Sequence, residues 1–127
     1  MSDPIVAAAA GSVAEVVAAL EGRLAAQGIQ LFAKIDHAAG ARAAGLELAD
    51  EVVLIFGSPA VGTALMQSAT IAGLDLPLRM LIWDDGGRTR LAFHDPRDLD
   101  ARYGLGSDAT TLARLRGLLD ALAAAVA

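Results

Sequence analysis

A stretch of small and apolar residues, from 56 to 83, constrains the fold of this chain more than any other part of it. The sequence there, FGSPAVGTALMQSATIAGLDLPLRMLIW, predicts the end of a strand, a turn of small residues, a short helix, a bend bounded by proline and a new strand. Residues 51–56 (EVVLIF) lead into it as a continuous apolar run. Such a run is typical of a central strand buried on both faces, so we expect Val53 and Ile55 to be as inaccessible as Leu54.

Helices and strands alternate along the rest of the chain. Apolar residues recur at helical spacing after Ser12, whose side chain suits a helix N-terminus, and Asp84-Asp85-Gly86-Gly87 predicts a tight hairpin. The predicted strands are residues 5–10, 30–36, 51–56, 78–83 and 89–93, and the predicted helices are residues 13–27, 37–44, 63–73, 96–103 and a last one capped by Ser107. This order predicts a single two-layer α/β (α+β) domain, residues 1–127, with helices packed on a mixed, mostly antiparallel sheet.

The composition excludes several classes of function. The chain has 127 residues, a formal net charge of -5 and no cysteine. Such an acidic chain lacks the clustered lysine and arginine that bind nucleic acid phosphates or anionic lipid. Without cysteine there is no disulfide, no thiolate metal site and no cysteine nucleophile. Residues 1–17 lack a basic segment, and no apolar run approaches about 18 residues, so we expect a cytoplasmic protein without a signal peptide or a membrane span.

Four motifs, in order along the chain, resemble those of the domain-of-unknown-function 302 family, a group of small bacterial and archaeal proteins. They are FAKIDHAAGARAAGLEL at 32–48, VVLIFGSPAVGTALMQ at 52–67, GLDLPLRMLIW at 73–83 and, more loosely, LAFHDP at 91–96. The similarity spans residues 29–104. It implies a small α/β fold and compact, often dimeric cytosolic proteins, and it implies no particular reaction. Ser58 and His94 stand where members of this family usually have asparagine.

The only two histidines each adjoin an aspartate at a predicted strand end, as Asp36-His37 and His94-Asp95. Imidazole and carboxylate groups are suitable metal ligands, and such pairs also orient general bases. If the two strand ends lie side by side, His37, His94 and Asp95 would form a metal site. The simpler interpretation is that Asp36 and Asp95 are helix N-caps.

The turn at residues 57–63 joins the apolar strand to the next helix. Backbone N–H groups in such a turn can bind a small anion at the helix N-terminus, although the lysine and the spacing of a nucleotide-binding loop are absent. The alternative is that Ser58 or Thr63 is a plain helix cap. Asp75 lies in an apolar bend, and its carboxylate needs hydrogen-bond donors, for which the amides of the nearby turn are candidates.

These observations place the best candidate site at a mouth formed by the end of the second strand and the turn after the third. The predicted ligand-binding residues are Asp36, His37, Gly57, Ser58, Gly62 and Thr63, with His94 and Asp95 as further members. We expect a module that binds a small ligand or associates with itself, as a symmetric homodimer, without a cofactor. The alternative function is a metal- or acid/base-dependent enzyme that uses Asp36, His37, His94 and Asp95.

Overall fold

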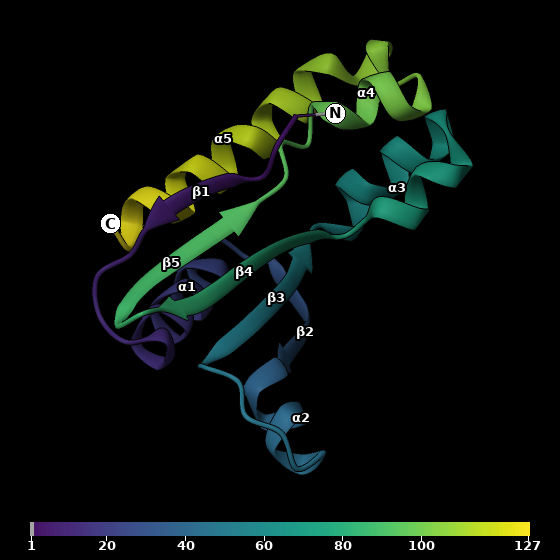
Figure 1. Cartoon of the computed structure of the whole chain (residues 1–127). Coiled ribbons are helices and arrows are strands. Elements are labelled where there is room, and N and C mark those ends of the chain that lie inside the picture. Colours follow the sequence, from purple (N-terminus) through teal and green to yellow (C-terminus); the bar gives the residue numbers. More distant parts are fainter. Residues whose placement is uncertain (1) are drawn as a thin grey trace.

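Five strands form one sheet in the order β1-β5-β4-β3-β2, and each neighbouring pair is antiparallel (Figure 1). The computed structural model describes residues 2–127. The strands are β1 (Ile5–Ala8), β2 (Gln30–Asp36), β3 (Glu51–Gly57), β4 (Leu78–Asp85) and β5 (Arg88–Phe93). The α-helices are α1 (Val13–Ala26), α2 (His37–Ala43), α3 (Pro59–Ser68), α4 (Asp98–Tyr103) and α5 (Ala109–Ala125), and the 3-10 turns are η1 (Thr70–Asp75) and η2 (Gly106–Asp108). The predicted two-layer α/β domain is confirmed, with a sheet that is antiparallel rather than mixed in the described residues.

Helix α1 packs behind the sheet in the view of Figure 1, and α5 packs on the same face. Helix α1 begins where the sequence predicts, because Ser12 forms a capping box. The Ser12 Oγ accepts a hydrogen bond from the Glu15 N–H (3.1 Å), and Glu15 Oε1 accepts one from the Ser12 N–H (3.1 Å). Apolar side chains of both helices meet alternate residues of the three central strands, and this contact forms the core: Val16, Leu20, Leu24, Leu119 and Leu122 of the helices, with Leu54, Phe56, Met80, Ile82 and Leu91 of the strands.

The hairpin between β4 and β5 also forms as predicted. Gly86 and Gly87 occupy its turn with φ angles of 61° and 92°, a region that glycine enters without steric cost. The Asp84 Oδ1 accepts a hydrogen bond from the Gly87 N–H at 2.8 Å, which closes the turn. The hairpin fixes the register of the central sheet, in which Leu81 lies opposite Ala92.

The second face of the sheet carries apolar side chains without a covering helix among the described residues. Val52, Leu54 and Phe56 of β3 are buried against the helices, whereas Val53 and Ile55 are only half-buried. The prediction that this strand is buried on both faces is therefore wrong for the isolated chain. The reason is that the sheet is antiparallel and all its long helices pack on one side, whereas a parallel sheet would have helices on both.

Two predicted helix boundaries need correction. Helix α3 starts at Pro59 and not at Thr63, because Ser58 is its N-cap and Pro59 occupies its first position. It ends at Ser68, and η1 continues the chain as a 3-10 turn. Helix α5 starts at Ala109, so Ser107 lies in η2 and does not cap it.

Candidate functional site

A cleft of about 520 Å³ opens between α3 and α5, at the end of the sheet where β3 ends and β4 begins. Seventeen residues line this α3–α5 cleft: Ile29, Phe32, Gly57, Ser58, Pro59, Val61, Gly62, Thr63, Leu65, Met66, Leu76, Pro77, Leu78, Thr111, Arg114, Leu115 and Leu118. Its lining is mostly apolar. A cleft of this size is typical of small-molecule sites, which measure about 300–1,000 Å³.

The strand-to-helix turn shapes the mouth of the α3–α5 cleft. Residues 57–63 are the end of β3, the N-cap Ser58 and the first residues of α3, and all of them except Ala60 line the cleft. Four of the six predicted ligand-binding residues, Gly57, Ser58, Gly62 and Thr63, therefore lie together there. Glycine keeps the wall open at two points. A Cβ on Gly62 would meet only Met66 Cε, at 3.8 Å, and a Cβ on Gly57 would meet Pro77 Cβ at 3.6 Å. A larger side chain at Gly62 would therefore project into the space of the cleft.

The polar groups of the cleft differ from those predicted. The Ser58 Oγ accepts a hydrogen bond from the Val61 N–H (3.4 Å), and the Gly62 N–H bonds to the Ser58 carbonyl oxygen (2.9 Å). Ser58 is therefore a helix cap, and these turn amides are already bonded within the chain. The cation of the cleft is Arg114 on α5, an exposed side chain that has no ion pair within residues 2–127. Sequence reasoning missed Arg114, because its proximity to the turn depends on how α5 packs.

Asp36 and His37 do not lie at this mouth. Strand β2 runs antiparallel to β3, so Asp36 pairs with Val52 at the start of β3, while Gln30 pairs with Gly57 at its end. The predicted mouth, which combined the end of β2 with the end of β3, is therefore wrong. Asp36 instead caps α2, where its Oδ1 accepts a hydrogen bond from the Ala39 N–H at 2.8 Å.

His94 and Asp95 lie at the same end of the sheet as the α3–α5 cleft, but in a different cleft of about 120 Å³ that also contains Asp75 and Arg79. His37 follows the end of β2, at the opposite end of the sheet, so the structure does not bring the two histidine–aspartate pairs together. Within residues 2–127, no three histidine or carboxylate side chains are grouped to hold a metal ion. The arrangement on which the metal and acid/base alternative depended is thus contradicted.

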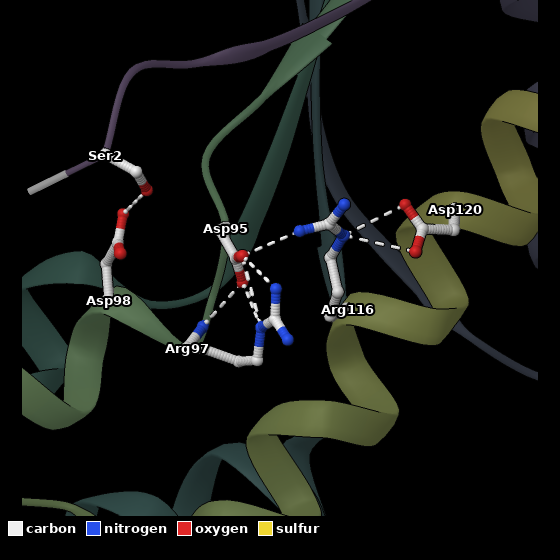
Figure 2. Close-up of polar contacts among 6 residues, drawn as sticks. All are labelled: Ser2, Asp95, Arg97, Asp98, Arg116 and Asp120. Atoms are coloured by element: carbon white, nitrogen blue, oxygen red, sulfur yellow. Dashed lines mark hydrogen bonds and ion pairs between the residues drawn. The ribbon is translucent and has the colours of Figure 1, made fainter.

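The Asp95 carboxylate accepts hydrogen bonds from two arginines (Figure 2). Its Oδ2 accepts hydrogen bonds from Nη2 of Arg97 (2.7 Å) and Nη1 of Arg116 (2.6 Å), and its Oδ1 accepts one from the Arg97 N–H (3.0 Å). Hydrogen bonding from Arg97 is the main reason that the pKa of Asp95 falls from its ordinary 3.8 to about 2, although partial burial opposes the change. Arg116 also bonds to Asp120, so this network joins the loop after β5 to α5.

Asp75 obtains its hydrogen-bond donors from α4 and not from the turn amides. The Tyr103 hydroxyl and Nη1 of Arg102 each donate to Asp75 Oδ2 at 2.6 Å. The hydrogen bond from Tyr103, followed by that from Arg102, holds the pKa of Asp75 below its usual value. The sequence correctly showed that this carboxylate needs partners, but no local pattern identified residues almost thirty positions away.

Comparison with known families finds one whose model matches most of the chain. A family model described as "Domain of unknown function DUF302" matches residues 5–122. The chain belongs to this family. The resemblance carried by residues 29–104 is thereby confirmed, and it extends over the flanking strand and helices of the DUF302 domain.

Known relatives support the fold more than any function. The chain is 42% identical over 109 residues to "Fluoride-specific ion channel FluC 1" of Brucella suis biovar 1 and to the protein of the same name from Brucella abortus biovar 1. The match covers 84% of this chain but only 43% and 40% of those proteins. A crystal structure of an uncharacterized conserved DUF302 protein from Bacillus stearothermophilus superimposes with a TM-score of 0.88 at 16% identity, over 98% of both chains. Among residues 2–127, no helix has the length and apolar character needed to cross a membrane.

Proposed function

We propose that this DUF302 domain binds a small molecule in the α3–α5 cleft, and that the ligand has an apolar body and one anionic group. The observation that carries the proposal is the cleft itself, whose lining is mostly apolar and whose one charged residue is Arg114. An apolar ligand body would contact side chains such as Leu65, Met66 and Phe32. Its anionic group would pair with the Arg114 guanidinium, since a charge-assisted hydrogen bond gives a ligand its orientation.

Fluoride itself is a poor fit to the α3–α5 cleft. A small, strongly hydrated anion must replace its water with several hydrogen-bond donors, because burying an unpaired charge among apolar groups is costly. The N–H groups of Val61 and Gly62 are already bonded within the chain, so the turn has few donors left. The names of the Brucella relatives therefore do not identify the ligand proposed for this cleft.

The test is a titration of the purified protein with sodium octanoate and with octan-1-ol, followed by native mass spectrometry. Both compounds have an eight-carbon chain, and only the first has an anionic group. We expect octanoate to bind more tightly than octanol, and Arg114→Gln to weaken octanoate about two- to fivefold, the size expected for an exposed ion pair. Arg23→Gln, which removes an exposed arginine of α1, is the matched control. If neither compound binds, the proposal is wrong.

A second candidate is self-association as a symmetric homodimer. It is favoured by the apolar face of the sheet opposite α1 and α5, on which Val6 and Ile35 are 52% and 44% exposed. An exposed apolar sheet face of this kind is a common site of protein contact. Sedimentation velocity at micromolar concentration tests it, and a monomer throughout would contradict it. A cytoplasmic location stays a prediction from the sequence.

A further inference from the structure

We propose that a second cleft, at the end of the sheet where β4 begins and β5 ends, binds a phosphate group through the side chains of Arg79 and His94. This Arg79 cleft measures about 120 Å³, and its charged and titratable lining residues are Asp75, Arg79, His94, Asp95, Asp98 and Arg102. It shares only the apolar residues Pro77 and Leu78 with the α3–α5 cleft. Because the polar groups of the two clefts differ, a phosphate site here stands or falls independently of the function proposed above.

Two carboxylates of the Arg79 cleft already have strong hydrogen-bond donors. The Asp75 Oδ2 accepts hydrogen bonds from the Tyr103 hydroxyl and from Nη1 of Arg102, each at 2.6 Å. The Asp95 carboxylate accepts hydrogen bonds from two further arginines, which are not lining residues of this cleft (Figure 2). Both negative charges are therefore compensated within the chain, and neither carboxylate needs a donor from a ligand.

Arg79 and His94 are the cleft's polar side chains that the chain leaves unused. Arg79 is exposed, and its side chain has neither an ion pair nor a hydrogen bond within residues 2–127. The exposed imidazole of His94 likewise has no partner in that part of the chain. The pKa of Asp75 is lowered mainly by the hydrogen bond from Tyr103, and the charge of Arg79 contributes to the same change, which shows that this charge acts on the cleft. Since guanidinium and imidazole groups supply N–H donors, the ligand they lack is an acceptor.

The register of the β4–β5 hairpin brings these two donors together. Leu81 of β4 lies opposite Ala92 of β5. Two residues further along each chain in the antiparallel direction, Arg79 and His94 come next to each other on the same face, and both line the cleft. A side-chain pair of this kind is held by the rigid sheet, so its donors are positioned before a ligand arrives.

The size of the Arg79 cleft favours a phosphate group over a larger ligand. A volume of about 120 Å³ has room for only about four water molecules, since each takes about 30 Å³ in the liquid. A guanidinium binds a phosphate through two parallel N–H groups. A tetrahedral phosphate then still has oxygen atoms that accept a hydrogen bond from the imidazole, which approaches from the neighbouring strand.

One charge of the Arg79 cleft opposes an anion. Asp98, in the first turn of α4, has no ion pair among the described residues, and its Oδ2 accepts a hydrogen bond from the neutral Ser2 hydroxyl at 2.6 Å. Its negative charge repels a phosphate in the same cleft. Removal of this charge should therefore strengthen binding, whereas removal of the Arg79 charge should weaken it. Opposite effects of two neighbouring substitutions distinguish a binding site from a general loss of folding.

The test is a calorimetric titration with sodium phosphate at constant ionic strength, in a buffer without other oxyanions. We expect Arg79→Gln to bind phosphate about fivefold more weakly than the wild type, the upper end for an exposed ion pair. His94→Leu should also bind more weakly, and His94→Asn should keep more affinity, because its amide retains an N–H donor. Asp98→Asn should bind more tightly. Arg114→Gln, which removes an exposed arginine of the other cleft, is the matched control and should bind phosphate as the wild type does.

Thermal midpoints show whether each variant is folded. A wild type that does not bind phosphate, or a folded Arg79→Gln that binds it equally well, overturns this site and leaves the function proposed for the α3–α5 cleft untouched. Equal weakening by Arg79→Gln and Arg114→Gln also overturns it, because the attraction is then not specific to one cleft. Equal affinity for sodium acetate, whose carboxylate has two oxygens, overturns the choice of phosphate. Octanoate binding that Arg114→Gln weakens and Arg79→Gln leaves unchanged is the expected result for two separate sites.

Discussion

The Tyr103 hydroxyl donates a 2.6 Å hydrogen bond to Asp75 Oδ2, and this bond joins α4 to the 3-10 turn η1. Arg102 donates to the same oxygen at the same distance. Beneath this contact lies a small second core formed by Leu65, Ala72, Leu99, Leu105 and Leu112, which packs α3 and η1 on α4 and α5. Because Leu65 also lines the α3–α5 cleft, the Asp75 contact helps to fix one wall of the candidate site.

Replacing Tyr103 with phenylalanine removes that donor and keeps the ring. We expect the free energy of unfolding to fall, because the folded chain loses a hydrogen bond to a charged group. Urea unfolding followed by circular dichroism measures the change. Asp75→Asn should reduce the effect of Tyr103→Phe in a double-mutant cycle. Additive losses would show that the two side chains do not interact.

The Asp95 network predicts a dependence of stability on acid. The folded pKa of about 2 lies below the ordinary 3.8, so the unfolded chain takes up a proton at a higher pH than the folded chain. The stabilisation is therefore complete above about pH 4 and is lost as the pH falls towards 2. This lowering of the pKa of Asp95 corresponds to about 2 kcal/mol of stability.

Asp95→Asn should accordingly lower the free energy of unfolding by up to about 2 kcal/mol at pH 7 and by much less at pH 2. Chemical unfolding at a series of pH values measures both. Asp100→Asn is the control, because Asp100 is exposed and has no ion pair within residues 2–127. A difference between wild type and Asp95→Asn that is the same at every pH would argue against the assigned cause.

A pair of neighbouring substitutions separates the two faces of β3. Leu54 is fully buried against the helices, so Leu54→Asp should abolish folding, because an unpaired buried charge costs several kcal/mol, comparable to the stability of a small domain. Ile55 lies on the sheet face opposite α1 and α5 and is half-buried, so Ile55→Asp should give a soluble folded chain that no longer forms the proposed homodimer. Expression level, thermal unfolding and sedimentation velocity measure these effects. Insoluble Ile55→Asp together with soluble Leu54→Asp would reverse the assignment of the faces.

Local signals in the sequence were sufficient for most of the fold. The Ser12 cap, the Gly86–Gly87 turn and the residues 30–36 strand each depend on neighbours in the sequence, and the structure confirms all three. Ser58-Pro59 is also a local signal for the start of α3, whereas Gly62 favours a turn and a later start at Thr63. The helical conformation prevails there because Pro59 suits the first position of a helix and Ser58 caps it.

The rest of the candidate site could not be predicted, because local signals in the sequence do not determine which loops meet in the fold. The order of strands in the sheet decides which loops meet, and no residue pattern showed that β2 runs antiparallel to β3. That one relationship separates His37 from Gly57 and brings Phe32 to the cleft in its place. Arg114 and the donors of Asp75 come from helices that follow later in the chain. Their positions depend on packing, so periodicity alone could not assign them to a site.

The most direct test of the proposed ligand-binding function is calorimetric titration of sodium octanoate into the wild type, Gly62→Val and Gly22→Val. Both substitutions place a branched side chain at a glycine within a helix, but only Gly62 lines the α3–α5 cleft, and a Cβ on Gly22 meets no atom within 4 Å. We predict that Gly22→Val binds octanoate as the wild type does, and that Gly62→Val binds at least about fivefold more weakly, because added methyl groups in a filled site typically cost about 1–3 kcal/mol. Thermal midpoints of both variants show whether they are folded. Equal binding by the wild type and a folded Gly62→Val would contradict the account and place the ligand outside this cleft.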